Sequence, residues 1–281
     1  MTSIRPAAVA GTFYPAAAQE LNALLDDCFQ TSPLGPQGVG KPNPSIVAGM
    51  VPHAGPVYSG PCAAQFYARI NPSMHSVILL GVNHSAKGHR AALSPWQSWR
   101  TPLGDVVVDE PLSDFLQARV NFLALDAQAH ADEHSIEIQL PFLQRVLDEF
   151  TFVPISLSHV SIDECAELGS AIAAAYQAAA KADAEAVILA SSDLSHYLSP
   201  AKTAELDGLA LDQVLHLDPE GLLRVVENRN ITMCGVLPTA VMLFAARELG
   251  VRQARLLKHC HSGDVTPMRK MVGYASVALE L

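Results

Sequence analysis

Several expected strands are followed directly by side chains that could bind a metal ion. These residues are His53 after the apolar run 45–51, His84 after the run 76–80, and Asp193 with His196 after the run 186–190. Neutral imidazole is a common ligand for iron, copper and zinc. A single histidine at a strand end more often hydrogen-bonds a loop, but two on parallel strands favour a metal site over that interpretation.

Asp193 and His196 are three residues apart. A helical turn after the strand would bring them side by side. A carboxylate beside an imidazole fixes its tautomer and raises its basicity, which suits a general base or a residue that supports a metal ligand. Asp193 could also serve as the N-cap of the helix that follows, and both interpretations can hold together.

A second polar cluster, residues 131–137, precedes an amphipathic helix whose apolar positions continue to Leu147. His134 and Glu137 share a face at a spacing of three. The order of residues is not HExxH, so a metalloprotease is excluded. A solvated helix start and a role in a pocket remain equally open for His134. Pro141 lies inside the expected helix, and we expect a kink there.

Cys234 stands at the head of an apolar helix expected over 237–249. The helix dipole favours a thiolate there, which could be a ligand or a nucleophile. Most free cysteines are small buried hydrophobic residues, and spacing alone favours that interpretation. The five cysteines contain no CxxC pair, which indicates a reduced, cytoplasmic protein. His259 and His261 have no third partner nearby, so we predict no role for them.

The elements that must position these residues alternate between continuous apolar strands and helices. This pattern predicts a mostly parallel sheet that is buried on both faces. In such sheets the ligand lies beyond the carboxyl ends of the strands. We expect one domain over residues 1–281, with an irregular connection at 31–44 that is rich in proline and glycine.

The composition supports a large core and excludes several classes of protein. The 281 residues are 49% hydrophobic and 16% charged, which excludes wholesale disorder. A net charge of −10 makes the chain a poor candidate for binding nucleic-acid phosphates. It has no run of apolar residues long enough to span a membrane, and its first residues do not resemble a signal peptide.

The motifs taken together resemble the Memo family, whose bacterial and archaeal members are called AmmeMemoRadiSam system protein B. The resemblance runs nearly end to end. Its motifs are 10–15 (AGTFYP), 51–55 (VPHAG) with 58–60 (YSG), 81–84 (GVNH), 100–104 (RTPLG), 132–137 (DEHSIE), 191–193 (SSD) with His196, Cys234-Gly235, and 262–264 (SGD). Each motif is weak, but their order and spacing together are specific.

The family is similar in fold to the class III extradiol ring-cleaving dioxygenases, which implies a single-domain, three-layer α/β sandwich around a non-haem iron site. Position by position, the resemblance places the metal on His53, His84 and Cys234. It gives His196 and His134 acid/base or substrate-contacting roles, with Asp193 beside them. A thiolate in place of the usual carboxylate makes the site softer, which favours iron or copper, with zinc as the alternative. It leaves an open position for water or substrate.

The leading hypothesis is therefore a metal-dependent redox enzyme of unknown substrate. The alternative is a protein without turnover that binds a peptide or a small anion in the same cleft. The third is a hydrolase with Cys234 as nucleophile, His196 as base and Asp193 orienting it. The resemblance also implies a functional association with a radical-SAM protein and an AMMECR-type protein. No membrane or nucleic-acid partner is expected.

Overall fold

A twelve-stranded sheet runs through the computed structural model, which describes residues 3–38, 40–181 and 185–281. Its strands are β1 (Ile4–Arg5), β2 (Ile46–Val51), β3 (Ser76–Val82), β4 (Ala91–Leu93), β5 (Ser98–Thr101), β6 (Gly104–Val108), β7 (Ala124–Leu125), β8 (Thr151–Leu157), β9 (Ala186–Ser191), β10 (His196–Leu198), β11 (Gln253–His261) and β12 (Met271–Glu280).

Helices lie between these strands along the chain. They are α1 (Ala18–Asp26), continued by a π-helical turn (Asp27–Thr31), α2 (Pro56–Tyr67), α3 (Glu110–Gln117), α4 (Gln128–Ala131), α5 (Gln139–Val146), α6 (Ile162–Lys181), α7 (Pro200–Leu215), α8 (Pro219–Asn228), α9 (Val236–Glu248) and α10 (Ser262–Val265). Among the described residues, no helix combines the length and the apolar character that crossing a membrane requires.

The middle of the sheet is parallel, as the apolar runs predict. Strands β6, β8, β3, β9 and β2 lie in that order, and each pair of neighbours runs in the same direction. The antiparallel strands β12 and then β11 follow β2. At the other side, β5 pairs antiparallel with β6. The prediction of a mostly parallel sheet is confirmed.

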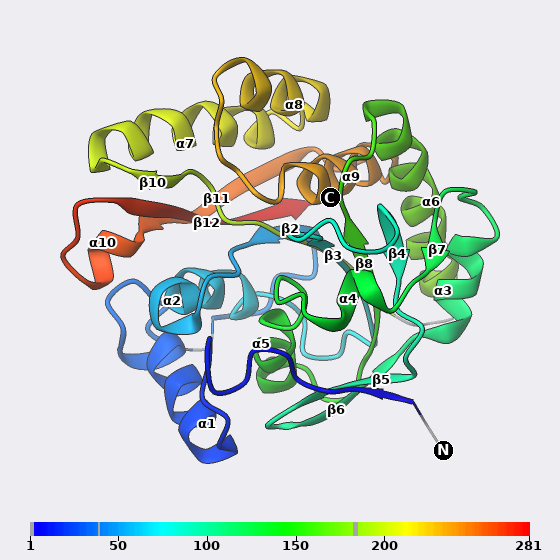
Figure 1. The fold of residues 1–281 in the computed structure, drawn as a ribbon, viewed down its shortest axis with the longest axis horizontal. Coiled ribbons are helices and arrows are strands. Elements are labelled where there is room, and N and C mark those ends of the chain that lie inside the picture. The colour runs from blue at the N-terminus through cyan, green and yellow to red at the C-terminus, as the bar shows by residue number, and fades with distance from the viewer. Residues whose placement is uncertain (1–2, 39, 182–184) are drawn as a thin grey trace.

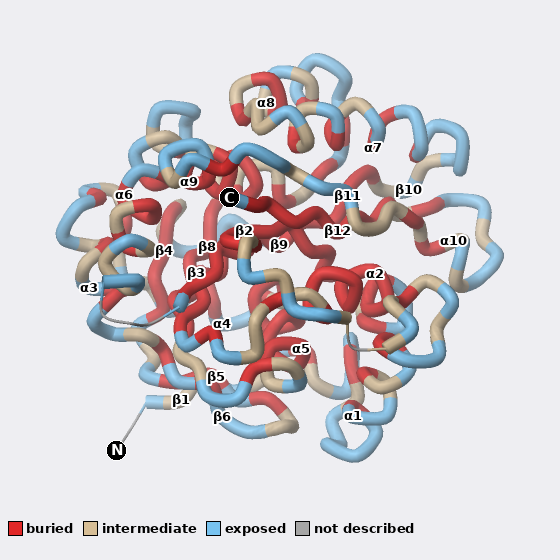
Figure 2. The backbone as a smooth tube through the Cα atoms, turned by 180° about the vertical axis from the view of Figure 1, so that it is seen from behind, coloured by how far each residue is buried: buried red, intermediate tan, exposed pale blue. Residues whose placement is uncertain are grey.

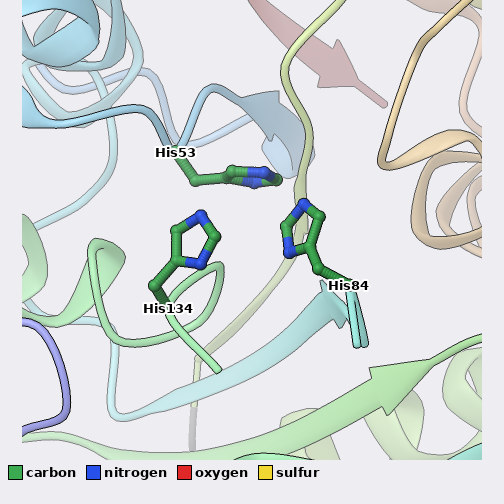
Figure 3. Close-up of side chains that lie close together, drawn as sticks. All are labelled: His53, His84 and His134. Atoms are coloured by element: carbon green, nitrogen blue, oxygen red, sulfur yellow. The ribbon is translucent and has the colours of Figure 1, made fainter. Parts of the chain in front are cut away.

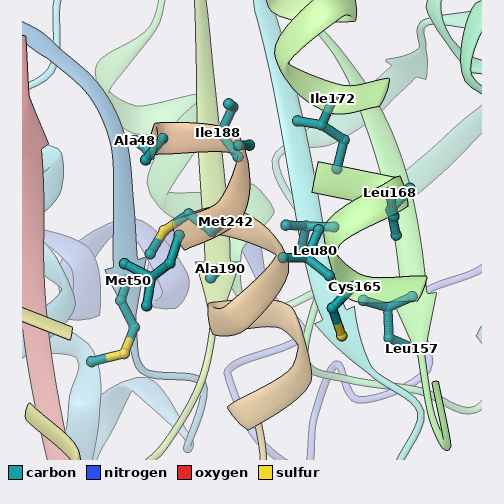
Figure 4. Packing of buried hydrophobic residues seen from close by; sticks show 14 of the residues in the cluster. Ala48, Met50, Leu80, Leu157, Cys165, Leu168, Ile172, Ile188, Ala190 and Met242 are labelled. Atoms are coloured by element: carbon teal, nitrogen blue, oxygen red, sulfur yellow. The ribbon is translucent and has the colours of Figure 1, made fainter. Parts of the chain in front are cut away.

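Helices cover both faces of this sheet, which gives three layers (Figure 1). Alternate residues of a strand point to opposite faces. Ile78 and Leu80 of β3 therefore pack in one core with α6 and α9, while Val77 and Leu79 pack in the other with α1, α2 and α5. Figure 4 shows Met242 of α9 lying against the first face. The central strands are buried along their length, and the exposed segments lie around them (Figure 2).

The segment between His134 and α5 differs from the prediction. The expected helix begins only at Gln139, and residues 134–138 form a turn in which the N–H of Ile138 donates to the carbonyl oxygen of His134. Pro141 is thus the third residue of α5. The first turn of a helix has no intrahelical acceptors for its N–H groups, so Pro141 removes no hydrogen bond. The expected kink was wrong.

A buried ion pair ties the N-terminal segment to this turn. The guanidinium of Arg5 lies 2.5 Å from the carboxylate of Glu137, and both side chains are fully buried. Arg5 also donates to the carbonyl oxygens of His130 and Glu133, at 2.8 and 2.6 Å. These acceptors lie on both sides of His134 in the sequence. Arg5 therefore fixes the segment that carries this histidine.

We expect Arg5→Met to lower the free energy of unfolding by about 3–5 kcal/mol, since it leaves the Glu137 carboxylate buried without its cation. Urea denaturation measures this change. Arg145→Met is the matched control, because Arg145 pairs with Asp26 on the surface and such pairs contribute about 1 kcal/mol or less. Equal losses in the two variants would contradict the structural role of Arg5.

Candidate metal centre

Three histidines meet where the parallel strands end. Strands β3, β9 and β2 are adjacent and parallel, so their carboxyl ends lie at one edge of the sheet. His53 follows β2, His84 follows β3, and His134 lies in the turn before α5. One ring nitrogen from each lies within 4.8 Å of the other two. In Figure 3, His84 and His134 each direct a ring nitrogen toward His53.

The tautomer of His53 follows from its hydrogen-bond partners. Its Nδ1 lies 3.0 Å from the hydroxyl oxygen of Ser191. That hydroxyl donates its only proton to the carbonyl oxygen of Ser135, at 2.6 Å, and also accepts from the Gln139 side chain. Ser191 must therefore accept from His53, so Nδ1 carries the hydrogen and Nε2 keeps a free lone pair.

The carboxylate of Glu133 holds the other two histidines. It accepts hydrogen bonds from the backbone N–H groups of His84, His134 and Ser135, at 2.8 to 2.9 Å. It also lies 3.0 Å from Nδ1 of His84 and 3.3 Å from Nδ1 of His134. A ring whose Nδ1 faces a carboxylate presents Nε2 to a metal, so Glu133 orients both rings.

The electrostatics keep these imidazoles in the form that binds metals. Burial lowers the pKa of His53 well below its usual value, and positive charge on His134 or His84 would lower it further. Burial also lowers the pKa of His134. For Glu133, burial alone would raise the pKa, but the hydrogen bonds from His84 and the Ser135 N–H and the charges of His84 and His134 together outweigh burial and bring the pKa to about 2. At neutral pH the carboxylate is thus ionised, and the imidazoles of His53 and His134 are neutral.

Cys234 lies beside His53, just before α9. Its Sγ is 3.2 Å from Nε2 of His53 and 3.7 Å from the carbonyl oxygen of Asp193. This approach needs Gly235, because a Cβ there would lie 2.3 Å from the Cβ of Ser192. Burial and the nearby charge of Asp193 raise the pKa of the Cys234 thiol, so it is protonated in the metal-free protein.

The three predicted metal donors and His134 therefore gather at one place, but not equivalently. The nitrogens of His53, His84 and His134 share one space, and Cys234 contacts this group through His53. The resemblance placed the metal on His53, His84 and Cys234 and gave His134 an acid/base role. In the structure one ring nitrogen of His134 instead lies within 4.8 Å of ring nitrogens of His53 and His84.

Asp193 and His196 are arranged differently from the prediction. Residues 192–195 form no helix, and His196 begins β10, so the expected helical turn and the N-cap at Asp193 were wrong. The carboxylate of Asp193 accepts from the N–H groups of His53 and Ala54, at 2.8 and 3.3 Å. Nδ1 of His196 lies 2.8 Å from the carbonyl oxygen of Thr232. Burial raises the pKa of Asp193 to about 6 despite its hydrogen bonds.

The sequence did not reveal the roles of Glu133, Glu137 and Ser191. Glu137 does not share a helix face with His134; it binds Arg5, and it accepts at 2.7 Å from the hydroxyl of Tyr14. The available signals were positional: Glu133 directly precedes His134, and Ser191 is the first polar residue after an apolar run.

Comparisons with known proteins identify the family of this chain. A family model described as Memo-like protein matches residues 5–278. The chain is 42% identical to a MEMO1 family protein of Ignicoccus hospitalis over 99% of both chains. It is 38% identical to one of Methanopyrus kandleri, over 97% of this chain and 98% of that one. Uncharacterized protein JW3007 of Escherichia coli shares the fold, with a TM-score of 0.53, 13% identity, and coverage of 83% of this chain and 99% of that one.

We expect Glu133→Gln to weaken metal binding by about 10- to 100-fold, because the amide cannot accept from all the groups that the carboxylate orients. Competition with a chelator of known affinity measures the loss, and circular dichroism checks that the fold is kept. Glu164→Gln is the control, since Glu164 pairs with Arg90 on the surface. Unchanged metal affinity in Glu133→Gln would refute the orienting role.

Proposed function

This chain belongs to the Memo family, and from that membership together with its converging imidazoles we propose that it is a metal-dependent redox enzyme that holds iron or copper. The single observation that carries the proposal is the approach of three histidine nitrogens to within 4.8 Å of one another. The substrate is a small molecule or peptide that approaches the centre from solvent.

The donor set fits such an ion. Imidazole suits iron, copper and zinc, whereas magnesium and manganese prefer oxygen ligands. Ser191 and Glu133 hold the other nitrogens of His53 and His84, so these rings are fixed before a metal binds. Bound iron or copper would supply one-electron exchange. Zinc fits the same donors but supplies no redox chemistry.

The centre is open to solvent on one side. The side chains of His84 and His134 are 34% and 21% exposed, while His53 is almost fully buried. The ring of Phe13 lies 4.6 Å from that of His134 and is 39% exposed, so it forms part of the rim. This opening supports access for a ligand. We propose an acid/base role for the half-buried His196. His134 would share that role only if Cys234, and not His134, is the third metal ligand.

The alternative of an anion-binding protein is less well supported. Such a site would need free backbone N–H groups in the loops after the strands. Those of His53 and Ala54 already donate to Asp193, and those of His84, His134 and Ser135 donate to Glu133. Two internal carboxylates thus occupy the donors that an external anion would use.

The hydrolase hypothesis is also less well supported. Among the described residues, Cys234 has His53 rather than His196 as its imidazole neighbour, and Asp193 hydrogen-bonds backbone N–H groups instead of His196. A raised thiol pKa is the opposite of what an activated nucleophile needs.

We expect protein purified without chelator to contain iron or copper, and His53→Ala to lose at least about 90% of it, since a buried ligand is removed. Elemental mass spectrometry measures the content. His75→Ala, an exposed histidine at the other end of β3, should keep the metal. Copper-loaded protein should also be reduced by ascorbate and reoxidised by oxygen, as followed by the electron paramagnetic resonance of Cu(II).

Zinc alone in the purified protein, or copper that ascorbate cannot reduce, would contradict the redox function and leave the metal site standing. Retention of metal in His53→Ala, His84→Ala and His134→Ala would contradict the site itself.

Proton release distinguishes two possible sets of metal ligands. One is His53, His84 and Cys234, as the resemblance implies, and the other is His53, His84 and His134. The Cys234 thiol is protonated in the metal-free protein, and only a thiolate binds a metal. If Cys234 is a ligand, binding releases about one proton at pH 7.5, and affinity rises with pH. Cys234→Ser should release about none. Titration of weakly buffered protein with a pH indicator measures this, and Cys165→Ser, a buried cysteine of α6, is the control.

Equal proton release from wild type and Cys234→Ser would exclude Cys234 as a ligand and leave the three histidines as the metal site.

A further inference from the structure

Strand β11 forms an open edge of the sheet. Its nine residues, Gln253–His261, pair antiparallel with β12, with a register shift between Leu256 and Lys258, and the described structure places no strand on its other side. Helices α2 and α7 pack near it, but Cys260 is its only buried residue. In Figure 2, β11 runs along the outside of the buried β12 as a mostly exposed and half-buried segment. The outward N–H and C=O groups of such a strand can pair with another chain.

This edge carries positive charge on an acidic protein. Residues 252–261 hold three of the 18 basic residues of the chain and none of its 28 acidic ones. Of the basic residues on or next to β11, Arg255 lies 3.5 Å from Glu280. Arg252 and Lys258 have no ion pair among the described residues. The surface around β11 thus has a local excess of positive charge, although the net charge of the chain is −10.

Helix α2 adds to this charge. Arg69, at its C-terminal end, lies close enough to Arg255 that the two charges repel. Leu256, which follows Arg255 in β11, is an apolar side chain that is 38% exposed. We call Arg69, Arg252, Arg255, Leu256 and Lys258 the basic edge.

We propose that β11 binds an extended acidic segment of a partner protein, which adds to the sheet as a further strand. Backbone hydrogen bonds along the strand would supply affinity, and carboxylates facing the basic edge would supply selectivity. The edge lies on the far side of β12 from β2 and is independent of the metal centre.

A second copy of this chain is a poor occupant. Antiparallel pairing of β11 with itself would set Arg252, Arg255 and Lys258 of one copy against the same residues of the other. Charged edge strands also occur simply because they prevent such pairing. That explanation predicts no affinity for an acidic strand, so binding decides between the two.

The probe is a nine-residue fluorescent peptide of alternating glutamate and valine with blocked ends. Fluorescence anisotropy should detect its binding, and the lysine–valine counterpart should bind at least about tenfold more weakly. Two further versions of the acidic peptide are methylated at backbone nitrogens. One is methylated at every glutamate and the other at every valine. A strand presents alternate N–H groups to its neighbour, so one version should lose at least about tenfold in affinity and the other should lose less.

The variant Arg252→Glu/Lys258→Glu should reduce the affinity at least about tenfold. Arg119→Glu, an exposed cation just after α3, should leave the affinity unchanged. Hydrogen exchange should show new protection of amides in 253–261 when the acidic peptide is bound.

Three results would overturn the proposal. Absence of peptide binding would mean that the charges of the basic edge serve only to prevent pairing of β11 with other strands. Equal binding of both methylated versions and the parent would mean charge attraction without strand addition. Tighter binding of double-stranded DNA or phosphatidylserine vesicles, competing with the peptide, would assign the basic edge to another kind of polyanion.

Discussion

The parallel hydrogen bonding of β3, β9 and β2 is the constraint on which the centre depends. The register sets Val51 of β2 opposite Ser191 of β9. His53, two residues beyond Val51, therefore lies within reach of the Ser191 hydroxyl that fixes its tautomer. A slip of one residue would turn Ser191 to the other face of the sheet and remove this contact. Strand pairing thus fixes the backbone positions from which His53 and Ser191 meet.

Two buried carboxylates then convert flexible loops into a fixed frame. Asp193 joins the loop after β9 to the loop after β2, and Glu133 joins the segment before α5 to the loop after β3. Burying a carboxylate is unfavourable unless charged hydrogen bonds compensate it. Glu133 accepts several such bonds and has a low pKa, while Asp193 accepts only two and has a raised one. The frame is therefore more firmly held on the His84 and His134 side.

The sequence could predict what depends on local pattern. Apolar runs predicted the central strands, and their order along the chain placed His53 and His84 at strand ends. It could not predict partners that meet only in the folded chain. The spacing of His134 and Glu137 fits a helix face, but Arg5, 132 residues away, pulls Glu137 into the core. Asp193 likewise caps no helix. Its carboxylate accepts a hydrogen bond from the N–H of His53, because β2 lies beside β9.

In the proposed iron or copper centre, a Cys234 thiolate would favour the oxidised over the reduced metal. The imidazoles of His53 and His134 are neutral, so Glu133 and Asp193 supply the nearby negative charge, and two carboxylates would balance one divalent cation. Asp193 cannot turn away from Cys234, because the N–H groups of His53 and Ala54 hold its carboxylate. A Cys234 thiolate would add a third negative charge to this low-dielectric site. Such an excess stabilises Fe(III) over Fe(II), or Cu(II) over Cu(I), and lowers the reduction potential. Protonation of Cys234 would remove the excess, so in the proposed centre proton uptake at this sulfur and reduction of the metal would favour each other.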